Sequence, residues 1–149
     1  MERNTFDRRI QLGASRRRRK DSEVLHDANR WAGAVYLGGY VVECALKALI
    51  CHEERRMSLS ETAIMARGTG GNTLHNLAKL LAAVPRVQRL ITNDRTHKLQ
   101  QAWNTIIQLW KKDSLRYSDK DGSQRDSERF QNAVREIHTL LLKVQGEAS

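Results

Sequence analysis

The chain has a single proline and two cysteines in 149 residues, and aromatic residues make up only 5% of it. Because proline interrupts helices, its scarcity leaves long stretches of the chain free to be helical. With so few aromatic residues, the core must be built mostly from leucine, alanine, valine and isoleucine. Charged residues account for 29% of the chain. This mixture predicts one soluble, all-helical domain that is large enough to bury a core without disulfides.

The two cysteines, Cys44 and Cys51, lie seven residues apart on one predicted helix. Two helical turns separate them by about 10 Å, whereas a disulfide requires Cα atoms within roughly 7 Å. We therefore expect free thiols, which suits a reducing cytoplasm. Neither cysteine has the spacing of a zinc site, so the sequence predicts no metal and no cofactor. Residues 1–20 lack the apolar core of a signal peptide, which also favours a cytoplasmic protein.

The net charge of +9 suits polyanionic partners such as RNA, DNA, nucleotides or an acidic protein. Residues 1–20 form a basic N-terminal segment that ends in five consecutive basic residues, 16–20. This run is either a solvated helix face or flexible arm, or a patch that contacts phosphates. The segment can also be part of the first helix. Residues 21–145 then form a single helical domain.

The most apolar stretch, residues 31–52, is long enough to span a bilayer, and its apolar residues surround the predicted helix on nearly all sides. Glu43 and Lys47 lie near its centre, where each charge would cost several kcal/mol in a membrane. We therefore predict the central helix of a bundle rather than a membrane span.

Other apolar patterns predict a first helix up to about residue 29, a third over 73–84, a short helical turn over 86–91 and a final helix after a polar loop at 113–124. Asn93 or Asp94 can cap a further helix that continues to about residue 112. Residues 53–72 are predicted to be a connector. The expected fold is an all-α, up-and-down bundle of four to five helices.

One face of the central helix is polar. Tyr36, Tyr40, Glu43 and Lys47 follow the spacing i, i+4, i+7 and i+11, which places them on one side, and Glu43 precedes Lys47 in the order that favours an ion pair. Two interpretations are open. The row is a polar contact that fixes helix register or a dimer, or it lines a cleft where tyrosines stack on a base and Lys47 meets a phosphate.

Three segments resemble HEPN domains. The stretch GAVYLGGYVVECALKALI resembles the signature helix of that family, TLHNLAKLL resembles its H-x-L-x-x-L-L helix, and WKKDSLRYS resembles its W…R-Y segment before the last helix. The likeness covers roughly residues 20–145. It implies a bundle of four or five helices, often a homodimer, in toxin–antitoxin or phage-defence loci. Many such proteins are encoded beside a minimal nucleotidyltransferase, which is a possible partner here.

Active HEPN proteins are metal-independent ribonucleases with an R-x(4–6)-H motif, in which histidine transfers protons and arginine stabilises the phosphate. This sequence matches that spacing only at Arg19-x6-His26, in or before the first helix, and not near Arg116 and Tyr117. His75 and Arg116 remain candidate catalytic residues. His75 can instead cap a helix or make a buried hydrogen bond. Arg116 can bind phosphate, or pair with Glu43 or with an aspartate across the bundle.

The sequence thus leads to three hypotheses. The first is a dimeric module that binds RNA or a nucleotide and a protein partner. The second is a ribonuclease toxin, and the third is a structural helical adaptor. In the first, the binding residues are those of the polar row together with two from the W…R-Y segment: Tyr36, Tyr40, Glu43, Lys47, Arg116 and Tyr117.

Overall fold

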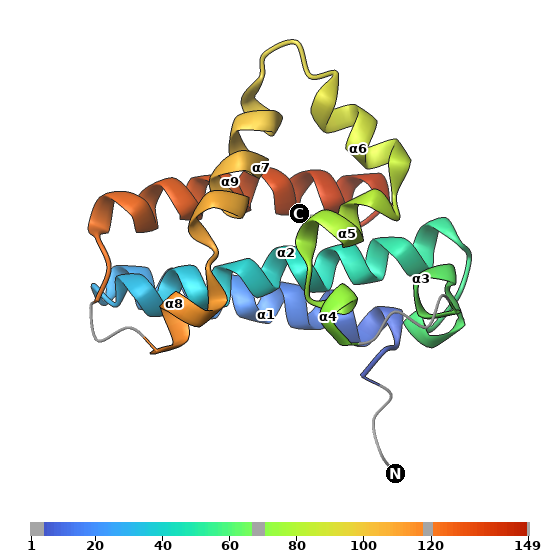
Figure 1. Cartoon of the computed structure of the whole chain (residues 1–149), viewed down its shortest axis with the longest axis horizontal. Helices are drawn as coiled ribbons and strands as arrows, with labels where there is room; N and C mark the ends of the chain where they lie inside the picture. Colours follow the sequence, from blue (N-terminus) through green and yellow to red (C-terminus); the bar gives the residue numbers. More distant parts are fainter. Residues whose placement is uncertain (1–4, 67–70, 118–120, 149) are drawn as a thin grey trace.

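A computed structural model describes residues 5–66, 71–117 and 121–148, which form helices joined by turns and one isolated bridge between Asp7 and Ser58. The long helices are α1 (Arg8–Asp27), α2 (Trp31–Glu53), α7 (Lys98–Leu109) and α9 (Gln124–Val144). Figure 1 shows them packed as a helical bundle. The predicted all-α class is therefore confirmed.

Shorter helices occupy the segments between the long ones, where the sequence predicted a connector, a third helix, a short helical turn and a polar loop. They are η1 (Leu59–Glu61), α3 (Ala63–Ala66), α4 (Gly71–Leu74), α5 (Leu77–Ala82), α6 (Pro85–Thr92) and α8 (Lys112–Tyr117). The predicted connector at 53–72 includes η1, α3 and the start of α4. The predicted polar loop at 113–124 contains most of α8, and its residues 118–120 lie outside the described ranges.

Two predicted helix boundaries are wrong because side chains cap the backbone at other positions. The helix expected over 73–84 is interrupted, since the Asn76 side chain accepts a hydrogen bond from the Lys79 amide and starts α5 there. The Asp94 carboxylate accepts hydrogen bonds from the amides of Thr96 and Leu99, and His97 has a left-handed φ of 62°. These hydrogen bonds form a turn after Asp94, and α7 therefore begins at Lys98 rather than directly after Asn93 or Asp94.

Helix α2 is the centre of the fold and packs against α1, α5, α8 and α9. Helix α1 runs antiparallel to α2, and α9 runs in the same direction as α2, with Phe130 beside Gly38 and Leu142 clustered with Ala48. Helix α7 departs from the expected up-and-down arrangement, because in Figure 1 it crosses α9 steeply. Helices α6 and α7 thereby form a hairpin that projects from the bundle.

Within the described residues, α2 is the one helix that is long and apolar enough to cross a membrane by these two criteria. Of its most apolar stretch, 78% is buried inside the protein. The neighbouring helices therefore cover the surface that lipid would otherwise have to cover.

The run of basic residues 16–20 lies in the middle of α1, so the basic N-terminal segment continues directly into the bundle from residue 8. Successive side chains on a helix point about 100° apart, and the run is accordingly spread around α1. Arg16 contacts Glu147, Arg18 pairs with Asp21 at 3.0 Å, and Arg19 pairs with Glu23 at 3.3 Å. The five cations therefore do not form one phosphate-binding patch.

A buried chain of hydrogen bonds joins α1 to α9. The Arg19 guanidinium lies 3.3 Å from His138 Nδ1, His138 Nε2 lies 3.1 Å from Ser15 Oγ, and Ser15 Oγ donates to the Leu12 carbonyl at 2.7 Å. Since arginine only donates and the Ser15 proton is already used, Nδ1 accepts and Nε2–H donates to Ser15. Every polar atom of the imidazole is satisfied when His138 is neutral.

Stability should fall in mild acid because of His138. Burial and the nearby Arg19 lower the pKa of His138 to about 4, so the unfolded chain takes up this proton near pH 6.5 while the folded protein does not. The contribution of neutral His138 to the free energy of unfolding is complete above pH 6.5 and is lost as the pH falls toward 4. We expect a loss of about 2 kcal/mol between pH 7 and pH 5.

Urea titrations at the two pH values would measure this loss, with His138→Gln as the control that keeps hydrogen bonding but cannot titrate. The difference in unfolding free energy between pH 7 and pH 5 should be smaller in the variant by about the predicted 2 kcal/mol. Equal pH dependence in both proteins would contradict the assignment.

Candidate functional site

The two tyrosines of the polar face contact each other on α2. The Tyr36 and Tyr40 hydroxyls lie 3.3 Å apart, and the rings meet edge to face with centroids 5.3 Å apart. Burial raises the pKa of Tyr40 to about 12, which keeps it a hydrogen-bond donor. Hydrogen bonds from Tyr40 and from Arg116 lower the pKa of Tyr36, which therefore acts as their common acceptor.

One turn further along α2, the buried Glu43 carboxylate gathers three side chains. Its Oε2 accepts from Lys47 at 3.2 Å, and its Oε1 lies 3.3 Å from the Lys112 ammonium and 3.4 Å from His75 Nδ1. The side chains of Glu43 and Lys47 are only 4% and 8% exposed. The predicted Glu43–Lys47 ion pair is confirmed, and it belongs to a network that joins α2 to the turn before α5 and to α8.

Trp110, just after α7, joins these two groups. Its indole N–H donates to the Tyr36 carbonyl at 2.9 Å, and its ring meets Tyr40 edge to face at 5.1 Å. The indole can lie this close to α2 only because residue 39 is glycine, since a Cβ at that position would come within 1.9 Å of the ring. Gly39 therefore leaves the space that Trp110 needs to pack against the polar face.

Cations from the start and end of α8 lie over these aromatic rings. The Lys112 ammonium is 4.4 Å from the Trp110 ring centroid and donates to the His75 carbonyl at 2.7 Å. The Arg116 guanidinium is 5.9 Å from the Tyr36 ring and 5.8 Å from Tyr117, which is 76% exposed. Such cation–π contacts are individually weak but fix both cations beside the tyrosines.

We call this assembly the polar seam. Its members come from α2, from the turn between α4 and α5, and from the segment after α7: Tyr36, Tyr40, Glu43, Lys47, His75, Trp110, Lys112, Arg116 and Tyr117. The structure thus brings together all the site residues named from the sequence.

Two expectations about these residues need correction. Arg116 does not pair with Glu43; Lys112 does, because it lies one turn closer to the start of α8. The His75 side chain neither caps a helix nor is buried, since it is 56% exposed and contacts Glu43. Trp110 is buried and also forms part of the seam. The sequence signal for Lys112 was available, as it stands in the same WKKDSLRYS segment.

The seam opens to solvent beside His75 and Lys112. A cavity of about 280 Å³ lies between α5 and α7, with apolar lining from Leu77, Ala78, Ile106, Ile107 and Trp110. A second hollow of about 520 Å³ adjoins it, and two ammonium groups, Lys111 and Lys112, and one carboxylate, Asp113, lie on its wall. An entering ligand therefore meets an apolar surface on one side and ammonium groups on the other.

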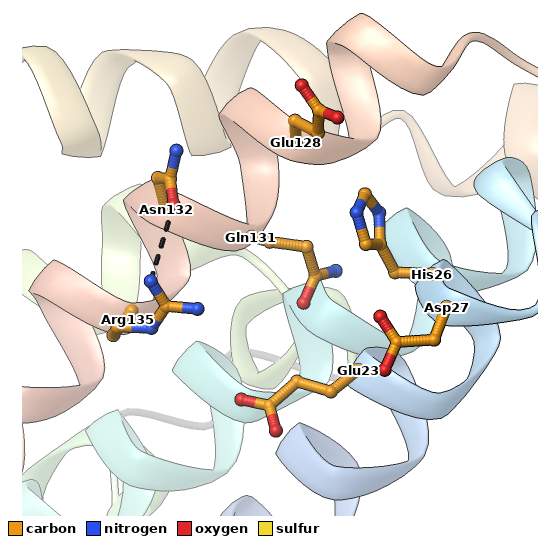
Figure 2. Close-up of a pocket in the computed structure, with 7 residues that line it drawn as sticks. All are labelled: Glu23, His26, Asp27, Glu128, Gln131, Asn132 and Arg135. Atoms are coloured by element: carbon orange, nitrogen blue, oxygen red, sulfur yellow. Dashed lines mark hydrogen bonds between the residues drawn. The ribbon is translucent and has the colours of Figure 1, made fainter.

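Another cavity, of about 470 Å³, lies between the end of α1 and α9 (Figure 2). Its lining faces inward from both helices and comprises Glu23, His26, Asp27, Glu128, Gln131, Asn132 and Arg135. His26 Nδ1 lies 2.7 Å from the buried Ser127 hydroxyl. Three carboxylates against one guanidinium make this cavity a poor site for phosphate.

The spacing match Arg19-x6-His26 does not form a joint site. His26 lines the acidic cavity, whereas the lining does not include Arg19, whose guanidinium is engaged with Glu23 and His138. Two helical turns separate the residues by about 10 Å along the axis. A ribonuclease would need both groups on the same phosphate.

The described residues form neither a reactive thiol nor a cluster of metal-binding side chains. Cys44 and Cys51 are free, as expected, and burial raises the pKa of each to about 11, which suppresses the nucleophilic thiolate. Within the described ranges, no cluster of three or more His, Cys, Asp or Glu side chains is arranged to hold a metal ion.

Comparison of the chain with family models, curated proteins and solved structures gives no match.

Proposed function

We propose that the protein is a HEPN-like module that binds RNA or a nucleotide at the polar seam. The observation that supports this most is the charge balance of the seam. One buried carboxylate, Glu43, is surrounded by two ammonium groups, and the Arg116 guanidinium lies two turns away over Tyr36. The surplus positive charge is fixed at the rim of an open cavity, where a phosphate can reach it.

The aromatic groups support the same ligand class. In proteins that bind single-stranded nucleic acid, the bases stack on aromatic rings, and arginine and lysine side chains contact the phosphate backbone. Tyr117 is exposed beside Arg116, and the indole of Trp110 lines the cavity between α5 and α7. The base of a nucleotide at the seam could therefore contact an aromatic ring while its phosphate contacts a neighbouring cation.

The proposal includes a homodimer that works in the cytoplasm with a minimal nucleotidyltransferase, in a toxin–antitoxin or phage-defence system. These parts rest on the resemblance of three segments to HEPN domains. The exposed Tyr117 and the exposed apolar Ile107, at 76% and 39%, are surfaces that such contacts could cover. We do not extend the proposal to ribonuclease activity, because Arg19 and His26 face different surroundings.

Binding should weaken when the partly exposed cations of the seam are neutralised. We expect Lys112→Gln and Arg116→Gln each to reduce affinity for a fluorescein-labelled RNA oligonucleotide or for ATP by about tenfold, because one charged hydrogen bond to phosphate is worth roughly 1.5 kcal/mol. Fluorescence anisotropy measures the RNA affinity, and calorimetry measures that for ATP.

Lys20→Gln is the matched control, since Lys20 is exposed on α1 and its loss changes the net charge equally. It should leave seam binding nearly unchanged. Equal affinity in all three variants, with melting temperatures preserved, would mean that the seam is a structural contact and would favour the adaptor hypothesis.

A further inference from the structure

Positive charge gathers in two parts of the chain, the basic N-terminal segment and a segment in the middle. Between Glu61 and Asp113 there is one acidic residue, Asp94, against eight basic ones: Arg67, Lys79, Arg86, Arg89, Arg95, Lys98, Lys111 and Lys112. The described part of this segment comprises α3 to α7 and includes the hairpin of α6 and α7 that projects from the bundle. The N-terminal segment 1–20 also has eight basic residues, against two acidic ones, but four of them in α1 contact carboxylates.

At the tip of this hairpin, three cations have no acidic partner in the described residues. Arg89 lies in the last turn of α6, Arg95 lies in the turn after it and Lys98 begins α7, and all three are exposed. Arg86 differs from them, because it is paired with Glu53. The carboxylate of Asp94, in the same turn, accepts hydrogen bonds from the Thr96 hydroxyl and from the Leu99 amide. The hairpin tip is therefore a free cationic surface.

At the other end of α7 stand Lys111 and Lys112, on the wall of the seam cavity. Helix α7 is twelve residues long, so about 18 Å separates the two cationic groups. Between them the helix carries no charge at all. Its exposed side chains are Gln100, Gln101, Asn104, Ile107 and Gln108. Cations thus stand at both ends of a row of amide and apolar groups.

We infer that a single strand of nucleic acid lies along α7, from the hairpin tip to the polar seam. Its phosphates contact Arg95 and Lys98 at one end and Lys112 at the other, and one base occupies the apolar cavity of about 280 Å³ beside Ile107 and Trp110. This inference rests on the proposed function and makes it more specific: the ligand is a polynucleotide rather than a mononucleotide.

The groups between the cations favour a single strand over a duplex. Amide side chains donate and accept hydrogen bonds with base edges, and apolar surfaces stack on base faces. In a duplex the base faces are covered by neighbouring base pairs, and the deep, narrow major groove of A-form RNA keeps its base edges from side chains. A strand with its bases exposed can use the amides of α7 and the cavity at its end. An acidic protein or an abasic polyphosphate would use only the two cationic ends.

The test compares a dinucleotide with a twelve-nucleotide strand, both oligouridylates labelled with fluorescein, by fluorescence anisotropy. Arg95→Gln/Lys98→Gln removes two of the three tip cations, and Arg17→Gln/Lys20→Gln removes two exposed cations from α1 as the matched control. We expect the tip variant to lose affinity for the long strand roughly 20-fold at 0.1 M salt, and the slope of log affinity against log salt to decrease by about 1.4. The dinucleotide, which cannot reach from Lys112 to the tip, should bind equally to the wild type and to the tip variant.

An abasic strand of twelve units should bind more weakly than the oligouridylate, because it lacks the stacking bases. The proposed binding along α7 (the α7 track) would be overturned if the tip and control variants lost the same affinity for the long strand. It would also be overturned if the wild type bound the abasic strand as tightly as the oligouridylate. If Lys112→Gln still weakens the dinucleotide, the seam remains a nucleotide site without a track. If the wild type binds none of the probes, both the track and the proposed function fail.

Discussion

Gly39→Ala should destabilise the protein by about 3 kcal/mol or more, the cost of overpacking at a site that cannot relax. A Cβ at this position would lie within 2.0 Å of Nε1 and 1.9 Å of Cε2 of the Trp110 indole, so the ring must move. If it moves, it loses its hydrogen bond to the Tyr36 carbonyl and its contact with Tyr40. Urea unfolding would measure the loss, and near-ultraviolet circular dichroism would report the indole.

Two other glycines of α2 supply a graded control for this prediction. At Gly33 a Cβ would meet Leu25 at 3.4 Å, an ordinary contact, so Gly33→Ala should stabilise the helix by up to about 1 kcal/mol. At Gly38 it would lie 2.8 Å from Phe130, which predicts an intermediate cost. A Gly39→Ala protein as stable as Gly33→Ala would contradict the close packing of Trp110 on α2.

Glu43→Gln should reduce the free energy of unfolding by about 3 to 5 kcal/mol, the usual cost of leaving a buried charge unpaired. Lys112 is 21% exposed and can turn toward water, but the Lys47 side chain is only 8% exposed and cannot. The uncompensated ammonium of Lys47 accounts for most of the expected loss. The midpoint of urea unfolding measures it directly.

The double variant Glu43→Met/Lys47→Met separates the charge effect from a packing effect. Replacing both members of a buried ion pair with apolar side chains of similar size is often neutral, so the double variant should be more stable than Glu43→Gln. If it is less stable, the packing of α2 rather than the unpaired charge determines the loss. Unchanged stability in Glu43→Gln would show that the carboxylate does not hold the seam together.

The sequence predicts the long helices well because their apolar patterns run over many turns. The expected helix over 31–52 is observed as α2 (Trp31–Glu53), and the four polar residues on it lie where their spacing places them. Helical periodicity identifies which residues share a face. It cannot identify what packs opposite them, and for that reason Lys112 and Trp110 were not assigned to the seam.

The middle of the chain was predicted less well for a local reason. The segment after α2 contains helices of three to eight residues, too short to show periodicity. Their boundaries depend on single caps such as Asn76 and on the Asp94 turn. Asn76 immediately precedes an apolar run, so its capping role could have been predicted from that position alone.

The placement of five basic residues inside α1 also affects how the protein meets proteases. Enzymes that cut after arginine or lysine need an extended backbone, so residues 16–20 would be a preferred target in an unfolded chain but are protected while α1 is packed on α2 and α9. Cleavage at this run therefore depends on how often α1 opens. Arg16, which contacts Glu147 and the Ala148 carbonyl in the folded protein, thus becomes part of a protease target when that helix detaches.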